Sequence, residues 1–155
     1  MEIRRAAPGD QPALGSLLGQ VLAVHHAGRP DLFRAEGRKY TDRELLAILA
    51  DDERPVFVAE EGGEVLGYAF CVFVRHEGEG ALRDHVSLYI DDLCVDEARR
   101  GRGVGGALFR FVRDFARAHG CYDLTLNVWA CNEDARRFYE RMGMKEQKIG
   151  METVL

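Results

Sequence analysis

Apolar residues recur along the chain with two different periods, and each period predicts one kind of element. Apolar positions three and four residues apart predict helices over about residues 11–26, 42–49, 104–119 and 133–142. Alternating or β-prone apolar runs predict strands over residues 2–5, 56–60, 65–74, 87–95 and 122–128. Residues 144–155 carry a weaker pattern, which we interpret as one or two closing strands.

Short polar signals at the ends of these runs support the predicted helix boundaries. A side-chain oxygen just before a helix can accept a hydrogen bond from one of its free amides, and glycine readily takes the left-handed conformation that ends a helix. The expected caps are Asp10, the Thr41–Glu44 capping box and Asn132 at helix starts, and Gly120 and Gly143 at helix ends.

The strand pattern predicts the fold class. The run over residues 65–74 is apolar on both faces, which indicates a central strand covered on both sides. Gly67 within it suggests a bulge or a close backbone approach. Gly62 and Gly63 predict a hairpin before it. We expect a single α+β domain over residues 1–155, with a mixed, mostly antiparallel sheet and helices on both faces.

Glycines and arginines are concentrated between the strand at 87–95 and the helix that follows. Residues 99–106 hold four glycines and three arginines within eight positions. The first amides of a helix lack partners inside it, and glycines let a bulky anion approach them. Arginine side chains match phosphate oxygens in pairs. This stretch therefore predicts a phosphate or diphosphate site, the alternative being a glycine-rich connection with solvated arginines.

Two common phosphate motifs fit this stretch poorly. A nucleotide P-loop needs Lys-Ser or Lys-Thr after its last glycine, whereas Ala107 follows Gly106. The spacing Gly101-x-Gly103-x-x-Gly106 matches a dinucleotide fingerprint, but that fold also needs an acidic residue at the end of the next strand. The strand at 122–128 ends without one, and a dinucleotide-binding domain is kept only as a less favoured alternative.

The same stretch resembles a known family. Arg100-x-x-Gly103-x-Gly105 resembles the acetyl-CoA signature of the GNAT superfamily of N-acetyltransferases, (Gln/Arg)-x-x-Gly-x-(Gly/Ala). Residues 91–96, 126–132 and 135–144 resemble the fourth strand, fifth strand and fourth helix of that family. The resemblance runs from about residue 56 to residue 144. It implies a GNAT-like fold and transfer of an acetyl group from acetyl-CoA, as co-substrate, to a primary amine in a ternary complex.

The resemblance also implies roles for individual residues. The backbone of the strand end would hold the pantetheine arm, the glycine-rich turn would hold the pyrophosphate, an amide would lie near the arm, and a tyrosine would protonate the leaving sulfur. The pantetheine arm would be held by Leu93, Cys94 and Val95. The pyrophosphate would be held by Arg100, Gly101, Arg102, Gly103, Val104, Gly105 and Gly106. The amide near the arm would be that of Asn132, and the tyrosine would be Tyr139. The alternatives are a helix cap only for Asn132 and a core aromatic residue for Tyr139.

The general base is open between neighbouring residues. An ammonium acceptor must lose a proton before it can attack, so the site needs a carboxylate or water held by one. Asp91 is slightly favoured and Asp92 is kept, while either could be a solvated acid at a strand end. His85 is a third option. Covalent catalysis by Cys94 would need an activating histidine, which the sequence does not show.

Composition narrows the class of protein. The chain has 155 residues and a formal charge of −5, which argues against nonspecific nucleic-acid binding. Four cysteines without metal spacing indicate reduced core thiols, and no metal site is expected. No apolar run suits a signal peptide or a membrane span, so we expect a cytoplasmic protein. The amine acceptor is not readable, a homodimer is possible, and a non-catalytic CoA-binding sensor is the alternative function.

Overall fold

The computed structural model describes residues 1–155 and contains one five-stranded sheet with four α-helices. The strands are β1 (Glu2–Arg5), β2 (Val56–Glu61), β3 (Glu64–His76), β4 (His85–Val95) and β5 (Asp123–Leu126). The helices are α1 (Gln11–Gly28), α2 (Asp42–Leu49), α3 (Val104–Ala118) and α4 (Glu133–Arg141), with short 3₁₀ turns at Pro8–Asp10 and Glu97–Arg99.

The strands lie in the sheet in chain order, and only β4 and β5 are parallel. The predicted α+β class with a mixed, mostly antiparallel sheet is confirmed. A dinucleotide-binding domain is built on a parallel sheet, so this topology argues against that alternative. None of the helices is both long enough and apolar enough to cross a bilayer.

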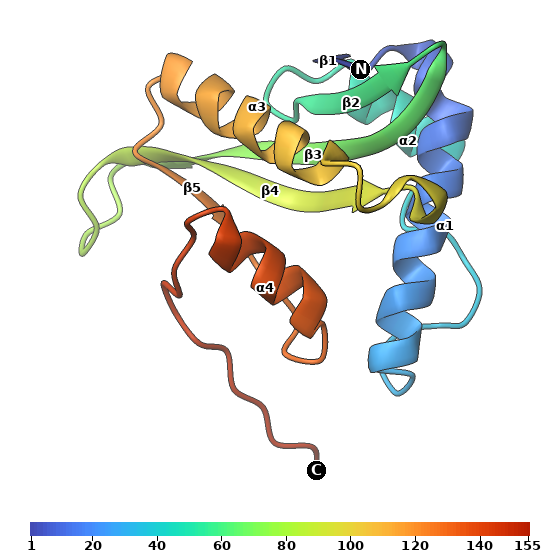
Figure 1. The fold of residues 1–155 in the computed structure, drawn as a ribbon. Helices are drawn as coiled ribbons and strands as arrows, with labels where there is room; N and C mark the ends of the chain where they lie inside the picture. Colours follow the sequence, from blue (N-terminus) through green and yellow to red (C-terminus); the bar gives the residue numbers. More distant parts are fainter.

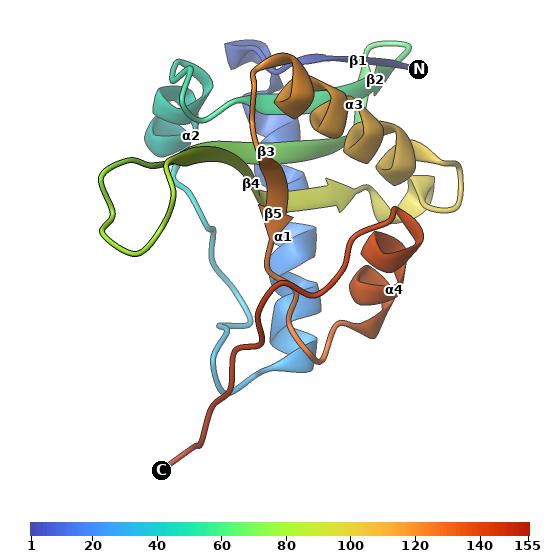
Figure 2. The ribbon, with the colours of Figure 1, turned by 90° about the vertical axis from the view of Figure 1, so that its left-hand side faces the viewer.

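Helices cover both faces of the sheet, and each face has its own apolar cluster. Figure 2 shows α3 and α4 on the right of the sheet and α2 on the left. The cluster under α1 and α2 includes Leu14, Leu45 and Tyr68, whereas the cluster under α3 includes Leu88 and Val112. β3 lies between β2 and β4 and is buried over its middle, as its two apolar faces predicted.

Gly67 is required by a close approach between β3 and β4. A Cβ atom built on Gly67 would lie 2.6 Å from the carbonyl oxygen of Cys94. Real Cβ atoms do not come this close to a backbone oxygen, so any other residue would push the end of β4 away. The predicted close backbone approach is thus confirmed, and it fixes the part of β4 that precedes the glycine-rich turn.

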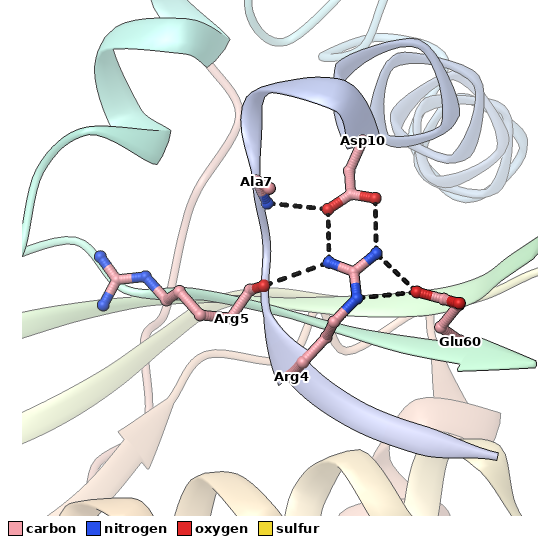
Figure 3. A network of polar contacts seen from close by, with 5 residues as sticks. All are labelled: Arg4, Arg5, Ala7, Asp10 and Glu60. Carbon is pink, nitrogen blue, oxygen red and sulfur yellow. Dashed lines mark hydrogen bonds and ion pairs between the residues drawn. The ribbon is translucent and has the colours of Figure 1, made fainter. Parts of the chain in front are cut away.

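The predicted cap at Asp10 is wrong. The Asp10 carboxylate makes no capping bond to α1 and instead accepts hydrogen bonds from Arg4 Nη1 at 2.8 Å, Arg4 Nη2 at 2.9 Å and the Ala7 amide at 2.8 Å. Arg4 Nε also donates to Glu60 at 2.7 Å. Figure 3 shows this network, which ties β1 to β2 and to the start of α1. A nearby guanidinium is a stronger partner than a helix amide, because both groups of the pair are charged.

The other caps form as predicted, but the closing strands do not. Thr41 and Glu44 make both bonds of a capping box, and Asn132 accepts from the Ala135 amide at 3.2 Å. Gly120 and Gly143 have φ values of 70° and 91°. Residues 145–155 contain no strand, and most of them are exposed (Figure 1), so the prediction of one or two closing strands is wrong. Their apolar side chains do not alternate regularly, which is why the prediction was weak.

Candidate active site

The sheet splits where β5 ends. β5 pairs with β4 only from Ser87↔Asp123 to Ile90↔Leu126, while β4 continues to Val95. Figure 1 shows β5 turning towards α4 as β4 runs on towards the glycine-rich turn. Residues 91–95 of β4 therefore have no strand partner on the β5 side. An open strand edge can hydrogen-bond an extended chain that carries amide groups.

Free amides lie beyond the open end of β4. Gly103 is the residue before α3 and has a φ of 81°, and Gly101 has a φ of 76°. None of the amides from residue 101 to residue 106 donates a hydrogen bond to another group of the chain. A Cβ atom built on Gly101 or Gly103 would meet nothing within 4 Å, so these amides lie beside open space. The structure thus gives the free N-terminal amides that bind phosphate groups well.

The arginines of the turn do not all face these amides. Arg99 pairs with Glu64 at 2.6 Å and Arg102 with Glu61 at 3.4 Å, so both are held towards the β2–β3 hairpin. Arg100 donates from Nε to the Val95 carbonyl at 3.3 Å. Arg110, one helical turn after Gly106 in α3, makes no ion pair, and its Nη1 would lie 3.2 Å from a Cβ atom on Gly106. Our sequence analysis missed Arg110, although the spacing of four from Gly106 on a helix was the available signal.

One cavity of about 2780 Å³ joins the open strand edge to the free amides. The predicted site residues that line it are Asp91, Asp92, Leu93, Cys94, Val95, Arg100, Gly101, Gly103, Val104, Gly105, Gly106, Asn132 and Tyr139. Two of the candidates lie elsewhere. Arg102 is on the hairpin side, and His85 hydrogen-bonds the Arg83 carbonyl at 2.8 Å and stacks on His76 with ring centroids 4.5 Å apart.

A bulge in β4 brings the two neighbouring carboxylates to the same side of the sheet. Cys71 pairs with Ile90 and Phe70 with Asp92, so Asp91 is an extra residue without a partner in β3. Strict alternation would send Asp91 and Asp92 to opposite faces. In the structure both reach hydroxyl groups on the α1 and α2 side, because Tyr40 donates to Asp91 at 3.0 Å and Tyr68 donates to Asp92 at 2.9 Å. Bulges are often found next to active sites, where they redirect a side chain.

Asp92 has a perturbed proton affinity. Burial raises the pKa of the Asp92 carboxyl, while the charge of Lys39 and the hydrogen bond from Tyr68 oppose that change. The Asp92 charge in turn opposes the effect of burial, which lowers the pKa of His25 on α1. Carboxyl groups whose pKa is raised by burial in a cavity are common at sites of proton transfer.

Lys39 and Tyr40 reach the same carboxylates from the connection between α1 and α2. The Lys39 ammonium lies 2.8 Å from Asp91 Oδ2, and it also lies 5.5 Å from the Tyr40 ring centroid. Burial lowers the pKa of Lys39, but the hydrogen bond and charge of Asp91 and the charge of Asp92 outweigh it, so the net change is upward. The sequence analysis gave neither residue a role.

Tyr139 on α4 packs its ring between two phenylalanines and faces the cavity. Its centroid is 5.0 Å from that of Phe138 and 6.2 Å from that of Phe109. The hydroxyl makes no hydrogen bond within the chain. Burial, assisted by the charge of Asp92, raises the pKa of Tyr139, so the phenol stays protonated. The residue combines the predicted core contact with a free proton donor.

Cys94 and Asn132 contribute less reactive groups to the cavity. Burial and the charge of Asp92 raise the pKa of the Cys94 thiol to about 12, and its Sγ lies 3.8 Å from the Leu17 carbonyl. A thiol with such a pKa forms almost no thiolate at neutral pH, so it is a poor nucleophile. Asn132 caps α4 through its side-chain oxygen, which leaves its side-chain nitrogen, Nδ2, without a partner.

Comparison with known proteins adds an independent line of evidence. Residues 22–144 match the family model described as Acetyltransferase (GNAT) family. The chain is 30% identical over 146 residues, 94% of its length and 91% of the relative, to YhfO of Bacillus subtilis, an uncharacterized N-acetyltransferase. It is 30% identical over 160 residues, 97% and 86%, to a probable glucosamine 6-phosphate N-acetyltransferase of Oryza sativa subsp. japonica. Streptothricin acetyltransferase of Streptomyces lavendulae is 31% identical over 156 residues, 92% and 80%.

Solved structures agree with these sequence relatives. The fold matches that of a tetramutant of the BH1408 protein of Bacillus halodurans with a TM-score of 0.95 and 32% identity, over 100% of both chains. An aminoglycoside acetyltransferase from an uncultured soil sample, in complex with sisomicin, matches with a TM-score of 0.75 over 99% of this chain and 95% of that one. At 20% identity, this second likeness concerns the fold alone.

Proposed function

The chain belongs to the GNAT acetyltransferase family and is an acetyl-CoA-dependent N-acetyltransferase, and from this premise we propose that it acetylates a primary amine by direct transfer within a ternary complex. The observation that carries the proposal is the split between β4 and β5. Free amides lie at one end of the open strand edge and a pair of carboxylates at the other. Four residue steps separate Val95 from Asp91, about 13 Å at about 3.3 Å per residue.

The residues of this cavity fit acetyl-CoA, which supplies the activated thioester. The free amides of residues 101–106 suit a diphosphate, because they stand at the positive end of the α3 dipole with no internal acceptor. Arg110 adds an unpaired guanidinium beside Gly106. The open edge of β4 from Leu93 to Val95 suits the amide groups of the pantetheine arm. We assign Asn132, which has a free amide nitrogen, to the same arm.

The carboxylates account for the amine side of the reaction. An ordinary alkylamine is protonated at neutral pH, and freeing its lone pair costs roughly 4–5 kcal/mol at a pKa of about 10.4. We assign Asp91 as the group that binds the acceptor ammonium and takes its proton, directly or through water. Asp91 binds the ammonium of Lys39 in the structure, so its carboxylate is placed where an acceptor ammonium could bind instead. Asp92 lies beside it and accepts a hydrogen bond from Tyr68.

Tyr139 accounts for the thiol side. The CoA sulfur leaves as a thiolate, whose conjugate acid has a pKa of about 8.5, so a nearby proton donor helps it leave below that pH. Tyr139 lines the cavity, stays protonated because burial raises its pKa, and has a hydroxyl without an internal partner. We therefore assign Tyr139 as the general acid.

Direct transfer is favoured over a covalent acetyl-cysteine. Cys94 is the thiol nearest to the carboxylates along β4, and its pKa of about 12 works against a thiolate. No histidine hydrogen-bonds Cys94, so it also lacks an activating base. The amine is thus expected to attack the acetyl carbon directly: the new C–N bond forms as the C–S bond breaks.

The acceptor is proposed by chemical class only. Relatives of this chain are named for glucosamine 6-phosphate and streptothricin. The acceptor end of the cavity is formed by the segment between α1 and α2 and by the turn before α4, where Phe33 meets Trp129 with centroids 5.2 Å apart. These segments carry no motif that identifies an acceptor. We therefore assign only one feature of the acceptor, a primary amine that binds next to Asp91.

The experiment is release of CoA thiol from acetyl-CoA with a library of primary amines, secondary amines and alcohols. We expect turnover with primary amines, and one acetylated amine, detected by mass spectrometry, for each CoA thiol released. Double-reciprocal plots of the initial rate should give intersecting lines when both substrates are varied. The Cys94→Ala variant should keep the same rate pattern. Parallel lines, or loss of turnover in Cys94→Ala with normal folding and acetyl-CoA binding, would contradict direct transfer. Acetyl-CoA binding without turnover of any amine would instead indicate a CoA sensor.

A further inference from the structure

Lys39 places a primary amine of the protein itself on the proposed base. It lies in the segment between α1 and α2, which runs beside α1 in Figure 1, and its Nζ is 2.8 Å from Asp91 Oδ2. The Tyr40 hydroxyl donates to the same oxygen at 3.0 Å. The Lys39 ammonium is therefore bound in the way that the proposed function requires of the acceptor ammonium.

The Lys39 amine also shares the cavity with the proposed thioester site. Lys39, Asp91 and the free amides before α3 line one cavity, and the Lys39 side chain is 40% exposed. Asp91 lies at the point where β5 leaves β4, which is the far end of the open edge from the free amides. An arm bound along this edge would bring its reactive end close to Asp91, and thus close to Lys39.

No other amine of the chain is placed in this way. The chain has three lysines, Lys39, Lys145 and Lys148, in addition to the N-terminal amine. Lys145 and Lys148 also line this cavity, but both are exposed, and neither forms an ion pair with a carboxylate as Lys39 does. The N-terminal ammonium pairs with Glu61 at 3.3 Å, near β1, which is the edge strand farthest from β5.

We propose that Lys39 is an intramolecular acetyl acceptor, so that the enzyme acetylates its own Lys39 when acetyl-CoA is bound and no external amine displaces it from Asp91. The inference rests on the proposed function. In the step, the Lys39 ammonium gives one proton to Asp91 or to water held by it. The Nζ lone pair then forms a bond to the acetyl carbon and the C–S bond breaks. The attacking nitrogen also loses its second proton, and the CoA sulfur takes the electron pair of the broken bond together with one proton. The products are N-acetyl-Lys39, CoA with a free thiol, and the proton first taken by Asp91, which passes to solvent.

The same ion pair keeps the Lys39 amine protonated before the step. The pKa of Lys39 is raised on balance, because the hydrogen bond and charge of Asp91 outweigh the effect of burial. The amine is therefore an ammonium in the resting enzyme. An external amine that takes its place on Asp91 removes Lys39 from the acetyl carbon, so acceptor turnover and self-acetylation compete.

The experiment incubates the purified enzyme with acetyl-CoA alone and locates acetyl groups by tandem mass spectrometry over time. We expect one acetyl group per chain on Lys39, at a rate at least about tenfold that of Lys145 or Lys148, because the bound amine reacts within one complex. The rate per chain should not depend on protein concentration. Desulfo-CoA should slow the reaction, and so should an amine from the library that turns over.

Matched controls separate the enzymatic step from chemical acetylation. Lys39→Arg should abolish the incorporated acetyl group, whereas the Lys145→Arg/Lys148→Arg double variant should retain it. Unfolding in urea should remove the preference for Lys39. Faster labelling of Lys145 or Lys148, or a preference that survives in urea, would overturn the inference. Turnover of library amines without any acetyl on Lys39 would overturn it while leaving the proposed function intact, and the absence of both reactions would contradict both.

Discussion

Removal of a single hydroxyl group tests the assignment of Tyr139. In Tyr139→Phe the ring keeps its contacts with Phe109 and Phe138, and the lost hydroxyl had no hydrogen bond in the chain. The free energy of unfolding should therefore change by less than about 0.5 kcal/mol. The affinity for acetyl-CoA should also change little, because the diphosphate would be held by amides before α3.

The expected loss is in the chemical step. A positioned general acid contributes roughly 10²–10⁴ in rate, and a hundredfold loss corresponds to about 2.7 kcal/mol of activation free energy. The deficit should be largest near neutral pH. It should shrink above about pH 8.5, where the CoA thiol ionises by itself and a thiolate can leave without a proton. The wild-type acid should not titrate in that range, because burial raises the pKa of Tyr139.

The assay compares thiol release by wild type, Tyr139→Phe and Tyr122→Phe across pH 6–10, a span that brackets the thiol pKa of about 8.5. Tyr122 is 80% exposed and lies outside the cavity, so its variant controls for loss of a tyrosine hydroxyl. Calorimetric titration measures acetyl-CoA affinity and thermal melting measures stability. Unchanged turnover in Tyr139→Phe would refute the assignment. A loss of turnover that is accompanied by weaker acetyl-CoA binding or by a lower melting temperature would also refute the assignment, because it would indicate that Tyr139 has a packing role.

Three further changes test the cavity and the fold. Gly103→Val should abolish measurable acetyl-CoA binding, because a side chain would cover the free amides. Gly78 also has a positive φ, of 69°, but lies outside the cavity, so Gly78→Val controls for a backbone strain of about 1–2 kcal/mol. Normal acetyl-CoA binding by Gly103→Val would contradict the amide site. Asp91→Asn should lower kcat by roughly 10²–10³ in the thiol-release assay, and a larger loss in Asp92→Asn would move the base to Asp92. Asp10→Asn should destabilise the protein by about 1.5–3 kcal/mol in urea unfolding at pH 7, whereas Asp52→Asn, at a fully exposed position, should have little effect. The hydrogen bond from Arg4 lowers the pKa of Asp10 below its ordinary value of 3.8, so the stabilisation is present above that pH and is lost as the pH falls through the lower folded value. The two proteins should therefore converge in acid, and a constant difference in stability down to about pH 2 would contradict this reasoning.

Local patterns in the sequence were enough to predict the elements and the fold class. The apolar run of β3 identified the central strand because burial on both faces requires apolar side chains at successive positions. The capping box at Thr41 and the left-handed helix ends at Gly120 and Gly143 follow from interactions within a few residues, which a sequence displays directly. The family motif identified the glycine-rich turn for the same reason, because its residues are contiguous.

Pairings between distant segments were not readable in the same way. Asp10 was predicted to cap α1, yet it binds Arg4, which is itself held by Glu60 once β1 has paired with β2. The end segment was predicted to form strands, but it pairs with no strand of the sheet in the structure. Both errors arise because a side chain or strand chooses the strongest partner that the fold brings near, and separation along the chain does not reveal it.

The sequence by itself determined that this chain forms a GNAT-like α+β fold with a glycine-rich turn before α3, since these features depend on periodicity and on contiguous motifs. The tertiary structure decided how the chemistry is arranged. The bulge at Asp91 breaks the alternation that would have sent Asp91 and Asp92 to opposite faces, and the segment between α1 and α2 brings Lys39 to Asp91 across 52 residues of chain. A bulge depends on the register between two strands and an ion pair on the path of a loop, so both are properties of the folded chain.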